Sequence, residues 1–220
     1  MLDIEHAALN DGASVAHSAY EVLKERIVTA VARPGSVISD WHVARELGIG
    51  RTPVREALQR LARERLVTIV PRRGAFVSDL QLLELQKISE VRMELEGFCA
   101  RLAAERATHE DSAVFKGILA REDTAYQHAD YTAVIQLDRQ LHQAIIRAAR
   151  NEYLGDCLEP LRNISTRAWY LTFERYGHLA ETVSEHHTIV AAIAARDADA
   201  ADSAMRQHVV SFRNKLRSII

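Results

Sequence analysis

Residues 39–66 constrain the fold of this chain more than any other stretch. They contain two short amphipathic helical patterns on either side of the turn sequence GIG. Ser39 is a natural N-cap for the first helix, and Thr52-Pro53 offers the second helix a capping hydroxyl and a first-turn proline. Two short helices, a tight turn and arginines at the start of the second helix are typical of a helix-turn-helix that reads the DNA major groove.

The segments around this stretch extend it to a complete domain. An amphipathic helix is predicted before it, over residues 20–31, and a β-hairpin after it, with strands at 67–70 and 75–77 joined by the turn sequence PRRG. A hairpin directly behind a recognition helix is the layout of a winged helix. The sequence therefore predicts a winged helix-turn-helix domain with a two-stranded wing over residues 15–78, preceded by a flexible arm over residues 1–14.

Beyond residue 79 the apolar residues follow helical periodicity, and no convincing strand pattern appears. Thr108, Asp130 and Asn151 each stand just before a periodic run, as N-caps do. Six helices are predicted, at 82–106, 109–127, 131–149, 152–175, 179–195 and 199–217. Pro160 lies inside the fourth and should kink or split it. We therefore expect a mainly α protein whose residues 79–220 form an antiparallel all-helical bundle of about six helices.

The charge distribution supports this division. Residues 14–78 carry 11 Lys and Arg against 6 Asp and Glu, whereas residues 79–220 carry 17 against 21. A basic front and an acidic rear fit a nucleic-acid-binding module joined to a domain that does not contact phosphate. No run of 18 apolar residues and no signal peptide is visible, which argues against a membrane or secreted protein. Cys99 and Cys157 form no motif and are interpreted as reduced core residues of a cytoplasmic protein.

Two arginines of the second short helix, Arg51 and Arg55, lie beside its N-terminal end. In a helix-turn-helix this end points into the groove, where amides and guanidinium groups meet phosphates and guanine edges. Both arginines could instead be solvated helix charges, but their position favours DNA contact. Arg72 and Arg73 could belong to an ordinary hairpin tip, but behind a helix-turn-helix they are interpreted as contacts to the DNA backbone.

Helical phase, taken at about 100° per residue, identifies polar residues on the apolar faces of the rear helices. Asp138 lies near the middle of the apolar stripe of the third predicted helix, and His142 lies at its side. His186 lies at the centre of the fifth stripe, whereas His187 lies at its edge, and His208 flanks the last stripe. One carboxylate and three imidazoles suit a divalent transition metal such as zinc, nickel or manganese, with open positions for water or a ligand. The alternatives are that each histidine is a hydrogen-bonded core residue and that Asp138 pairs with an inward arginine.

These residues resemble those of a known family. ARPGSVIS, ELGIGRTPVREALQRL and LVTIVPRRGAFVS look like the winged-helix domain of GntR-family bacterial transcription regulators. VRMELE, DRQLH, EHHTIVAAI and MRQH resemble the all-helical FCD ligand domain of the FadR branch, and six rear helices resemble its VanR-like subgroup. The resemblance implies a homodimer on a short palindromic operator, released or rearranged when a small carboxylate metabolite binds. Repression is the more common outcome in the family.

The resemblance also implies roles for individual residues. The metal ligands carried over from DRQLH, EHHTI and MRQH are the same four residues that helical phase selects. Arg92 of VRMELE matches a family arginine that would anchor an effector carboxylate, although it could simply pair with Glu96. Further pocket candidates are Arg162, Arg167 and Tyr170. The DNA contacts that carry over are Arg51, Thr52, Arg55, Arg73 and Gly74.

Three positions depart from the family pattern within the predicted DNA reader. Trp41 replaces a frequent DNA-contacting arginine, Gly50 replaces a common serine, and Arg65 replaces the usual glycine after the recognition helix. Operator preference is therefore where the resemblance is least informative. Two other functions compete with a regulator: a metal-dependent enzyme acting on a small organic acid, and an architectural DNA-binding protein whose bundle only dimerises. The first lacks a marked base or nucleophile, and the second leaves the inward histidines unexplained.

Overall fold

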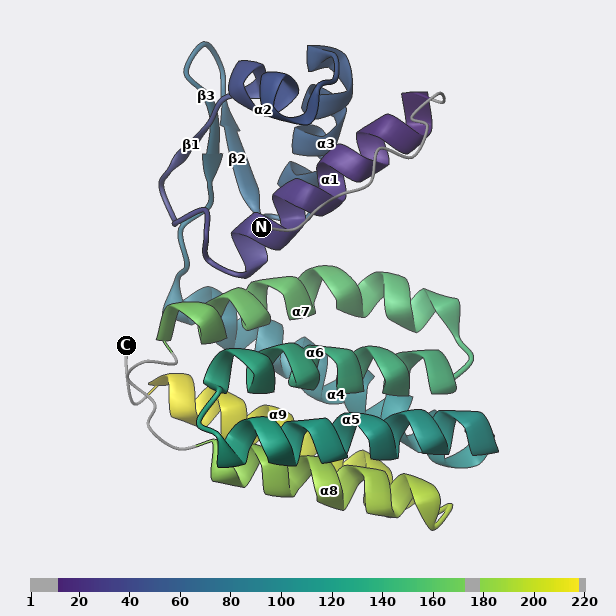
Figure 1. Cartoon of the computed structure of the whole chain (residues 1–220). Helices are drawn as coiled ribbons and strands as arrows, with labels where there is room; N and C mark the ends of the chain where they lie inside the picture. Colours follow the sequence, from purple (N-terminus) through teal and green to yellow (C-terminus); the bar gives the residue numbers. More distant parts are fainter. Residues whose placement is uncertain (1–11, 173–178, 218–220) are drawn as a thin grey trace. The chain divides into compact units, whose positions relative to one another are not determined.

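The computed structural model describes residues 12–172 and 179–217 of the 220-residue chain. Up to Asp79 these residues form one compact unit, and from Leu80 they form another (Figure 1). Most of the predicted arm over residues 1–14 lies outside the described residues, as does the end of the fourth predicted helix. The last three residues of that arm belong to the first turn of a helix.

The first unit is a three-helix domain with a small antiparallel sheet. Its helices are α1 (Gly12–Val28), α2 (Asp40–Leu47) and α3 (Arg51–Arg63), and its strands are β1 (Val37–Ile38), β2 (Val67–Val70) and β3 (Gly74–Val77). The sheet order is β1-β3-β2, with Val37 opposite Phe76 and Val67 opposite Val77. The predicted two-stranded hairpin, β2 and β3, is confirmed, and β1 adds a third strand that was not predicted. A strand of two residues is too short to show alternation in a sequence.

The helix ends test the predicted caps. Ser39 is the N-cap of α2, because its hydroxyl accepts a hydrogen bond from the His42 amide at 3.3 Å. The predicted capping role of Thr52 is wrong: α3 begins at Arg51, and Gly50 is its N-cap without a side-chain hydrogen bond. The Thr52 hydroxyl is therefore not needed for the cap, and the residue is exposed.

The structure also differs from expectation in the bounds of α1 and shows how the chain turns after α3. The predicted helix over residues 20–31 begins earlier and ends at Val28, and Val31 is 76% exposed rather than part of the core. After α3, Arg65 adopts the left-handed conformation, with φ of 61°, at the position where the family usually has glycine. The turn is therefore retained, but arginine is more strained than glycine in this left-handed conformation.

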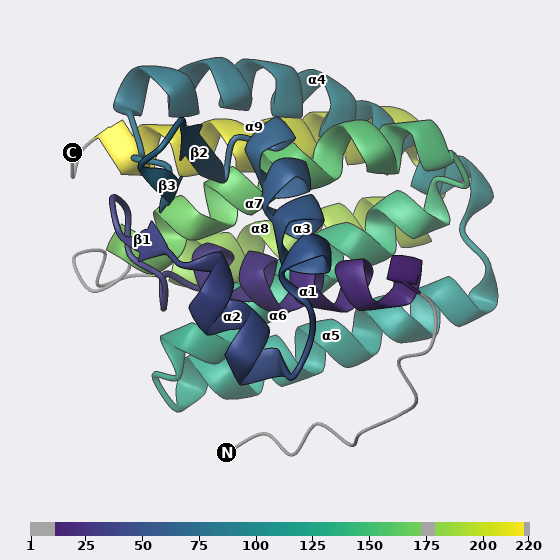
Figure 2. The ribbon, with the colours of Figure 1, turned by 90° about the horizontal axis from the view of Figure 1, so that it is seen from above.

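The second unit is an all-helical bundle (Figures 1 and 2). Its helices are α4 (Leu82–Arg106), α5 (His109–Gln127), α6 (Tyr131–Ala148), α7 (Glu152–Thr172), α8 (Ala180–Ala194) and α9 (Ala198–Arg217). The prediction of six helices is confirmed over the described residues. α4 packs most extensively along α9, and α5 packs against α6 and α8. The core is built largely from small and branched apolar side chains of α4, α5, α6, α8 and α9.

Several details of the bundle follow from single residues. Thr108 forms a capping box with Asp111, and the Asp130 side chain accepts from the Ala133 amide at 3.0 Å, as expected of N-caps. Pro160 lies inside α7 without splitting it. Of the two cysteines, only Cys99 is buried; Cys157 is exposed, so its predicted place in the core is wrong.

The backbone at Ala129, just after α5, is strained, and the strain should be measurable. Ala129 has a φ of 55° in a turn where its amide donates to Tyr126 and the Asp130 amide donates to Ala125. Glycine adopts this conformation without a Cβ clash, so Ala129→Gly should raise the free energy of unfolding by about 0.5–1 kcal/mol. Ala120→Gly, at an exposed position inside α5, should instead lower it by about 1 kcal/mol. Urea denaturation would measure both, and equal destabilisation by the two changes would contradict the strain.

Candidate metal centre and nucleic-acid interface

The four predicted metal ligands converge inside the bundle. Asp138 and His142 lie on α6, His186 on α8 and His208 on α9, and one ligand atom of each lies within 4.8 Å of all the others. The Nε2 atoms of His186, His142 and His208 lie 3.2, 3.5 and 3.8 Å from Asp138 Oδ1. All four residues are buried. The four residues that helical phase selects therefore place their ligand atoms close together.

Each histidine has a second carboxylate on its other ring nitrogen. Glu122 of α5 accepts from His186 Nδ1 at 2.9 Å, and Glu185 of α8 accepts from His208 Nδ1 at 2.9 Å. Glu96 of α4 lies against His142 Nδ1. A carboxylate at Nδ1 fixes the tautomer and leaves the Nε2 lone pair directed at the centre, as in metal-binding histidines.

The centre contains acceptors without a matching donor. The Nε2 atoms of His142 and His208 are 3.1 Å apart, and the Nδ1 atoms of these rings face Glu96 and Glu185 instead. His186 Nε2 approaches Asp138 closely, but among the described residues it has no partner with hydrogen-bond geometry. If all three imidazoles are neutral, their Nε2 lone pairs and a carboxylate oxygen repel one another unless a cation, either a proton or a metal ion, lies among them. The donor set therefore fits a divalent transition metal.

Burial and the neighbouring charged groups shift the pKa values of the cluster. Burial by itself lowers the pKa of His186, but the Asp138 and Glu122 carboxylates outweigh it and raise this pKa to about 9. Burial lowers the pKa of His208 to about 4; the hydrogen bond to Glu185 opposes this shift and the charge on His186 adds to it. Burial raises the pKa of Asp138, but its histidine neighbours and Arg162 hold it well below the usual range. The carboxylates thus favour a positive charge on His186, whereas burial and that charge oppose a second one on His208.

The supporting carboxylates were not predicted, although the sequence contains a signal for one of them. Glu122 is fully buried and continues the stripe that Phe115, Ile118 and Leu119 form on α5. The phase test that selected Asp138 would have selected Glu122 as well. Glu96 is buried on α4, where nearly half of the helix is buried and the apolar direction is poorly defined.

A small cavity lies beside the cluster. Arg92, Arg162, Ser165, Thr166, Trp169 and Phe212 line it together with Asp138 and His208. Its volume of about 20 Å³ is room for a single water. The Trp169 and Phe212 rings pack edge to face, with centroids 5.4 Å apart. A larger ligand therefore binds only if lining side chains move.

The two arginines that line the cavity also have partners within the protein. Arg92 Nε donates to Glu96 at 2.6 Å, so the predicted alternative of an i,i+4 pair is present. Arg162 donates to Glu96 at 2.9 Å and lies 3.4 Å from Asp138 Oδ2. Asp138 thus faces the histidines with one oxygen and an arginine with the other. The cavity-lining residues include neither Arg167, which is buried, nor Tyr170, which is half-buried.

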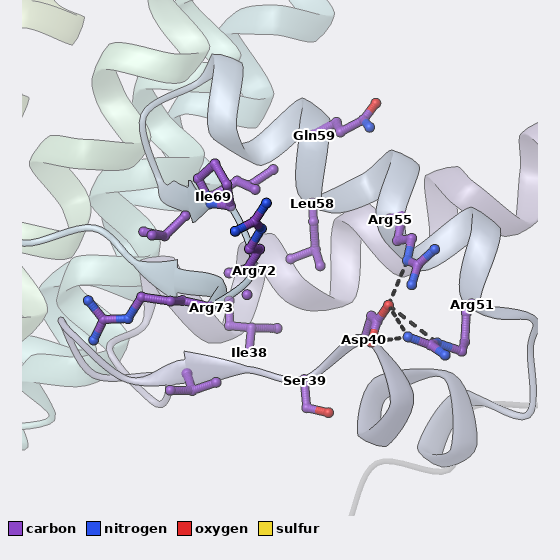
Figure 3. A pocket seen from close by; sticks show the side chains of 15 residues that line it. Ile38, Ser39, Asp40, Arg51, Arg55, Leu58, Gln59, Ile69, Arg72 and Arg73 are labelled. Carbon is purple, nitrogen blue, oxygen red and sulfur yellow. Dashed lines mark hydrogen bonds and ion pairs between the residues drawn. The ribbon is translucent and has the colours of Figure 1, made fainter.

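The predicted DNA contacts gather around a groove in the first unit (Figure 3). The groove, about 590 Å³ in volume, runs between α3 and the hairpin. Ile38, Leu58 and Ile69 provide apolar lining. The lining includes five of the six predicted DNA contacts: Arg51, Arg55, Arg72, Arg73 and Gly74. The sixth, Thr52, is exposed in the first turn of α3.

The tip of the hairpin is shaped by backbone conformation. Arg72 has a φ of 64° and Gly74 a φ of 106°, so two left-handed residues flank Arg73 in the turn. The Arg73 guanidinium lies 6.0 Å from the Phe76 ring centroid. On α2, Trp41 is 49% exposed, with the Arg45 guanidinium 5.4 Å from its ring. An exposed aromatic therefore stands where the family often has an arginine.

The chain matches two family models along most of its length. Residues 15–77 match the model of bacterial regulatory proteins of the gntR family, and residues 87–211 match the FCD domain. In the described part of the chain, no helix combines the length and apolarity needed to cross a membrane.

Similar proteins are regulators as well. The chain is 28% identical over 211 residues to the HTH-type transcriptional repressor RspR of Escherichia coli, covering 96% of this chain and 92% of that protein. It is 27% identical over 177 residues to the E. coli regulator McbR, covering 80% of each. The solved structure of E. coli McbR/YncC has the same fold, with a TM-score of 0.84, 24% identity and coverage of 93% of this chain and 97% of that one.

The family and these relatives decide between the competing functions. The family and the two relatives are transcription regulators rather than enzymes. The alternative of a metal-dependent enzyme is therefore not supported. The two matched models occur in the order that the winged helix-turn-helix and the helical bundle have in the structure. The chain therefore belongs to the GntR family of DNA-binding transcription regulators and carries an FCD domain.

Proposed function

We propose that this regulator is a repressor that binds a short palindromic operator as a homodimer and responds to a small carboxylate metabolite. Residues 15–78 contact the operator, and residues 79–220 hold a divalent metal, bind the metabolite and form the dimer. The similarity to RspR, which is named a repressor, supports the direction of regulation. A palindromic operator follows from two-fold symmetry, because each subunit reads one half-site.

The observation that carries the metal proposal is the convergence of three Nε2 atoms on Asp138 Oδ1. Asp138, His142, His186 and His208 are the proposed ligands, and zinc, nickel and manganese fit this mixture of imidazole and carboxylate. Glu96, Glu122 and Glu185 orient the imidazoles. A bound divalent metal supplies a positive charge beside the cavity, and such a charge attracts a carboxylate.

The cavity between α7 and α9 is the proposed effector site. Arg92 and Arg162 bring two guanidinium groups to it, and Ser165 and Thr166 are hydroxyl-bearing residues in its lining. Arginine forks bind carboxylates well because two parallel N–H donors match the two oxygens. No effector contact is assigned to Arg167 or Tyr170, since neither lines the cavity.

Both cavity arginines already donate to Glu96, so an effector carboxylate competes with that residue. Glu96 also lies against His142. The competition therefore links the effector site to a metal ligand through one buried side chain. Effector binding also requires some of the lining side chains to move, because the cavity is smaller than any organic acid.

A thermal-shift screen of sugar acids, hydroxy acids and aromatic acids on metal-loaded protein tests the effector proposal. A ligand that binds only the folded state raises the melting temperature, and we expect at least one acid to do so while its primary amide does not. The same acid should weaken binding to a duplex that the protein has enriched from a randomised pool. If acids and amides stabilise equally, or a stabilising acid leaves DNA affinity unchanged, the effector proposal fails.

For the DNA interface, α3 presents Arg51, Thr52 and Arg55 from its first turns, and the wing presents Arg72, Arg73 and Gly74. Backbone amides at a helix start and arginines around one groove provide the donors that phosphates and guanine edges accept. The proposed recognition is therefore base reading from α3 and backbone contact from the wing.

A further inference from the structure

A single carboxylate engages both arginines at the start of α3. Asp40, the first residue of α2, accepts from Arg55 Nε at 2.7 Å. It also accepts from Arg51, through Nε at 3.3 Å and through a terminal nitrogen at 3.0 and 3.1 Å (Figure 3). The Arg51 and Arg55 side chains are 53% and 60% exposed, so they remain accessible.

The two arginines use different donors for this contact. Arg51 turns the edge formed by Nε and a terminal nitrogen toward Asp40. Arg55 donates only through Nε, and within the described residues its two terminal nitrogens have no hydrogen-bond partner. Two parallel guanidinium donors are what a guanine O6/N7 edge accepts. Asp40 thus holds the inner end of Arg55 and leaves the outer end ready for a base.

We propose that Asp40 is a specificity-determining residue that positions Arg55 for guanine and weakens attraction to DNA of arbitrary sequence. This inference rests on the proposed role of α3 in base reading. Asp40 touches no base in this scheme and acts through Arg55.

Two physical effects of the carboxylate work in the same direction. Positioning reduces the rotamer freedom that Arg55 loses on binding a base, which favours only those sequences that offer a guanine there. The negative charge of Asp40 also offsets part of the charge of two arginines. Binding to arbitrary DNA depends on phosphate attraction and counterion release, so this offset weakens it most. The guanidinium of Arg55 lowers the pKa of Asp40, which keeps the carboxylate ionised.

The Asp40→Asn variant tests the proposal with two duplexes of equal length and composition. One is the duplex that wild-type protein enriches from a randomised pool, and the other is its scrambled sequence. We expect affinity for the enriched duplex to fall about tenfold and affinity for the scrambled duplex to rise about threefold. The ratio of the two affinities therefore falls roughly thirtyfold.

Two further variants separate positioning from general charge. Glu56→Gln removes an exposed carboxylate from α3 itself and should raise both affinities alike, leaving their ratio unchanged. In an Arg55→Ala background, Asp40→Asn should change the ratio much less, because the residue that it positions is absent and only the charge offset on Arg51 remains. Melting temperatures check folding, which should change little since the Asp40 ion pairs are exposed.

The outcomes divide clearly. If Asp40→Asn raises both affinities in parallel, as Glu56→Gln does, the residue contributes charge only and the inference is overturned. The same conclusion follows if its effect on the ratio is undiminished without Arg55. A wild-type protein that enriches no duplex would overturn the DNA-binding proposal itself, and this inference with it.

Discussion

His186→Ala should lower the affinity for Zn²⁺ by more than about 100-fold. Loss of a residue that only orients a ligand costs about 10- to 100-fold, and His186 is proposed as a ligand itself. It is fully buried, and its Nε2 is the closest of the three to Asp138 Oδ1. Isothermal titration of chelator-stripped protein with Zn²⁺ would measure the loss, and elemental analysis of the purified variant would show its metal content.

His187→Ala is the matched control, because the adjacent histidine is exposed and contacts Asp123 at the surface. It should retain wild-type affinity. Glu122→Gln should lie between the two, about 10- to 100-fold weaker than wild type, since it removes the carboxylate on His186 Nδ1 but no ligand. Equal losses in His186→Ala and His187→Ala would rule out the proposed ligand set.

Arg55→Ala should reduce affinity for the enriched duplex at least about 30-fold. A bidentate arginine–guanine pair is worth about 1–3 kcal/mol, a homodimer loses it at both half-sites, and about 1.4 kcal/mol corresponds to tenfold. Fluorescence anisotropy at fixed salt would measure the change. Arg55 is exposed, so its loss should leave the melting temperature and Zn²⁺ affinity close to those of the wild type.

Arg63→Ala provides the comparison for that loss. Arg63 is an exposed residue of the last turn of α3, far from the N-terminal end of the helix, and carries the same charge. Its removal should weaken binding only a few-fold, through reduced phosphate attraction. Undiminished affinity in Arg55→Ala, or an equal loss in both variants, would contradict base reading by the start of α3.

The sequence predicts the elements of this fold well, because long helices and a hairpin have strong periodic signals. Its errors occur where local signals are weak or compete. β1 has two residues and forms only because β3 lies beside it, a pairing that no local pattern reveals. Thr52 has the composition of an N-cap, but the chain enters α3 one residue earlier, at Gly50. Cys157 sits in a helical pattern whose exposed side cannot be recognised without its neighbours.

The candidate metal centre was predictable for a physical reason. An ionisable residue on an apolar stripe must find a partner inside the core, so the helical phase of Asp138 and three inward histidines already indicates a common point. The arginine partners were not predictable. Whether Asp138 faces histidines or Arg162 depends on how α6 and α7 are rotated against each other, and the structure has it contact both. The link between Asp40 and Arg55 likewise depends on the angle between two helices.

The cluster around Asp138 draws a side chain from each of the six helices of the bundle, with Glu96 on α4 and Arg162 on α7 completing the set. Its contacts join residues as far apart along the chain as Asp138 and His208. A fragment or half-docked intermediate that lacks one of these helices lacks part of the set. If the proposed metal binding holds, metal uptake therefore follows tertiary assembly. The metal content of a preparation then measures the fraction of its molecules that are correctly assembled.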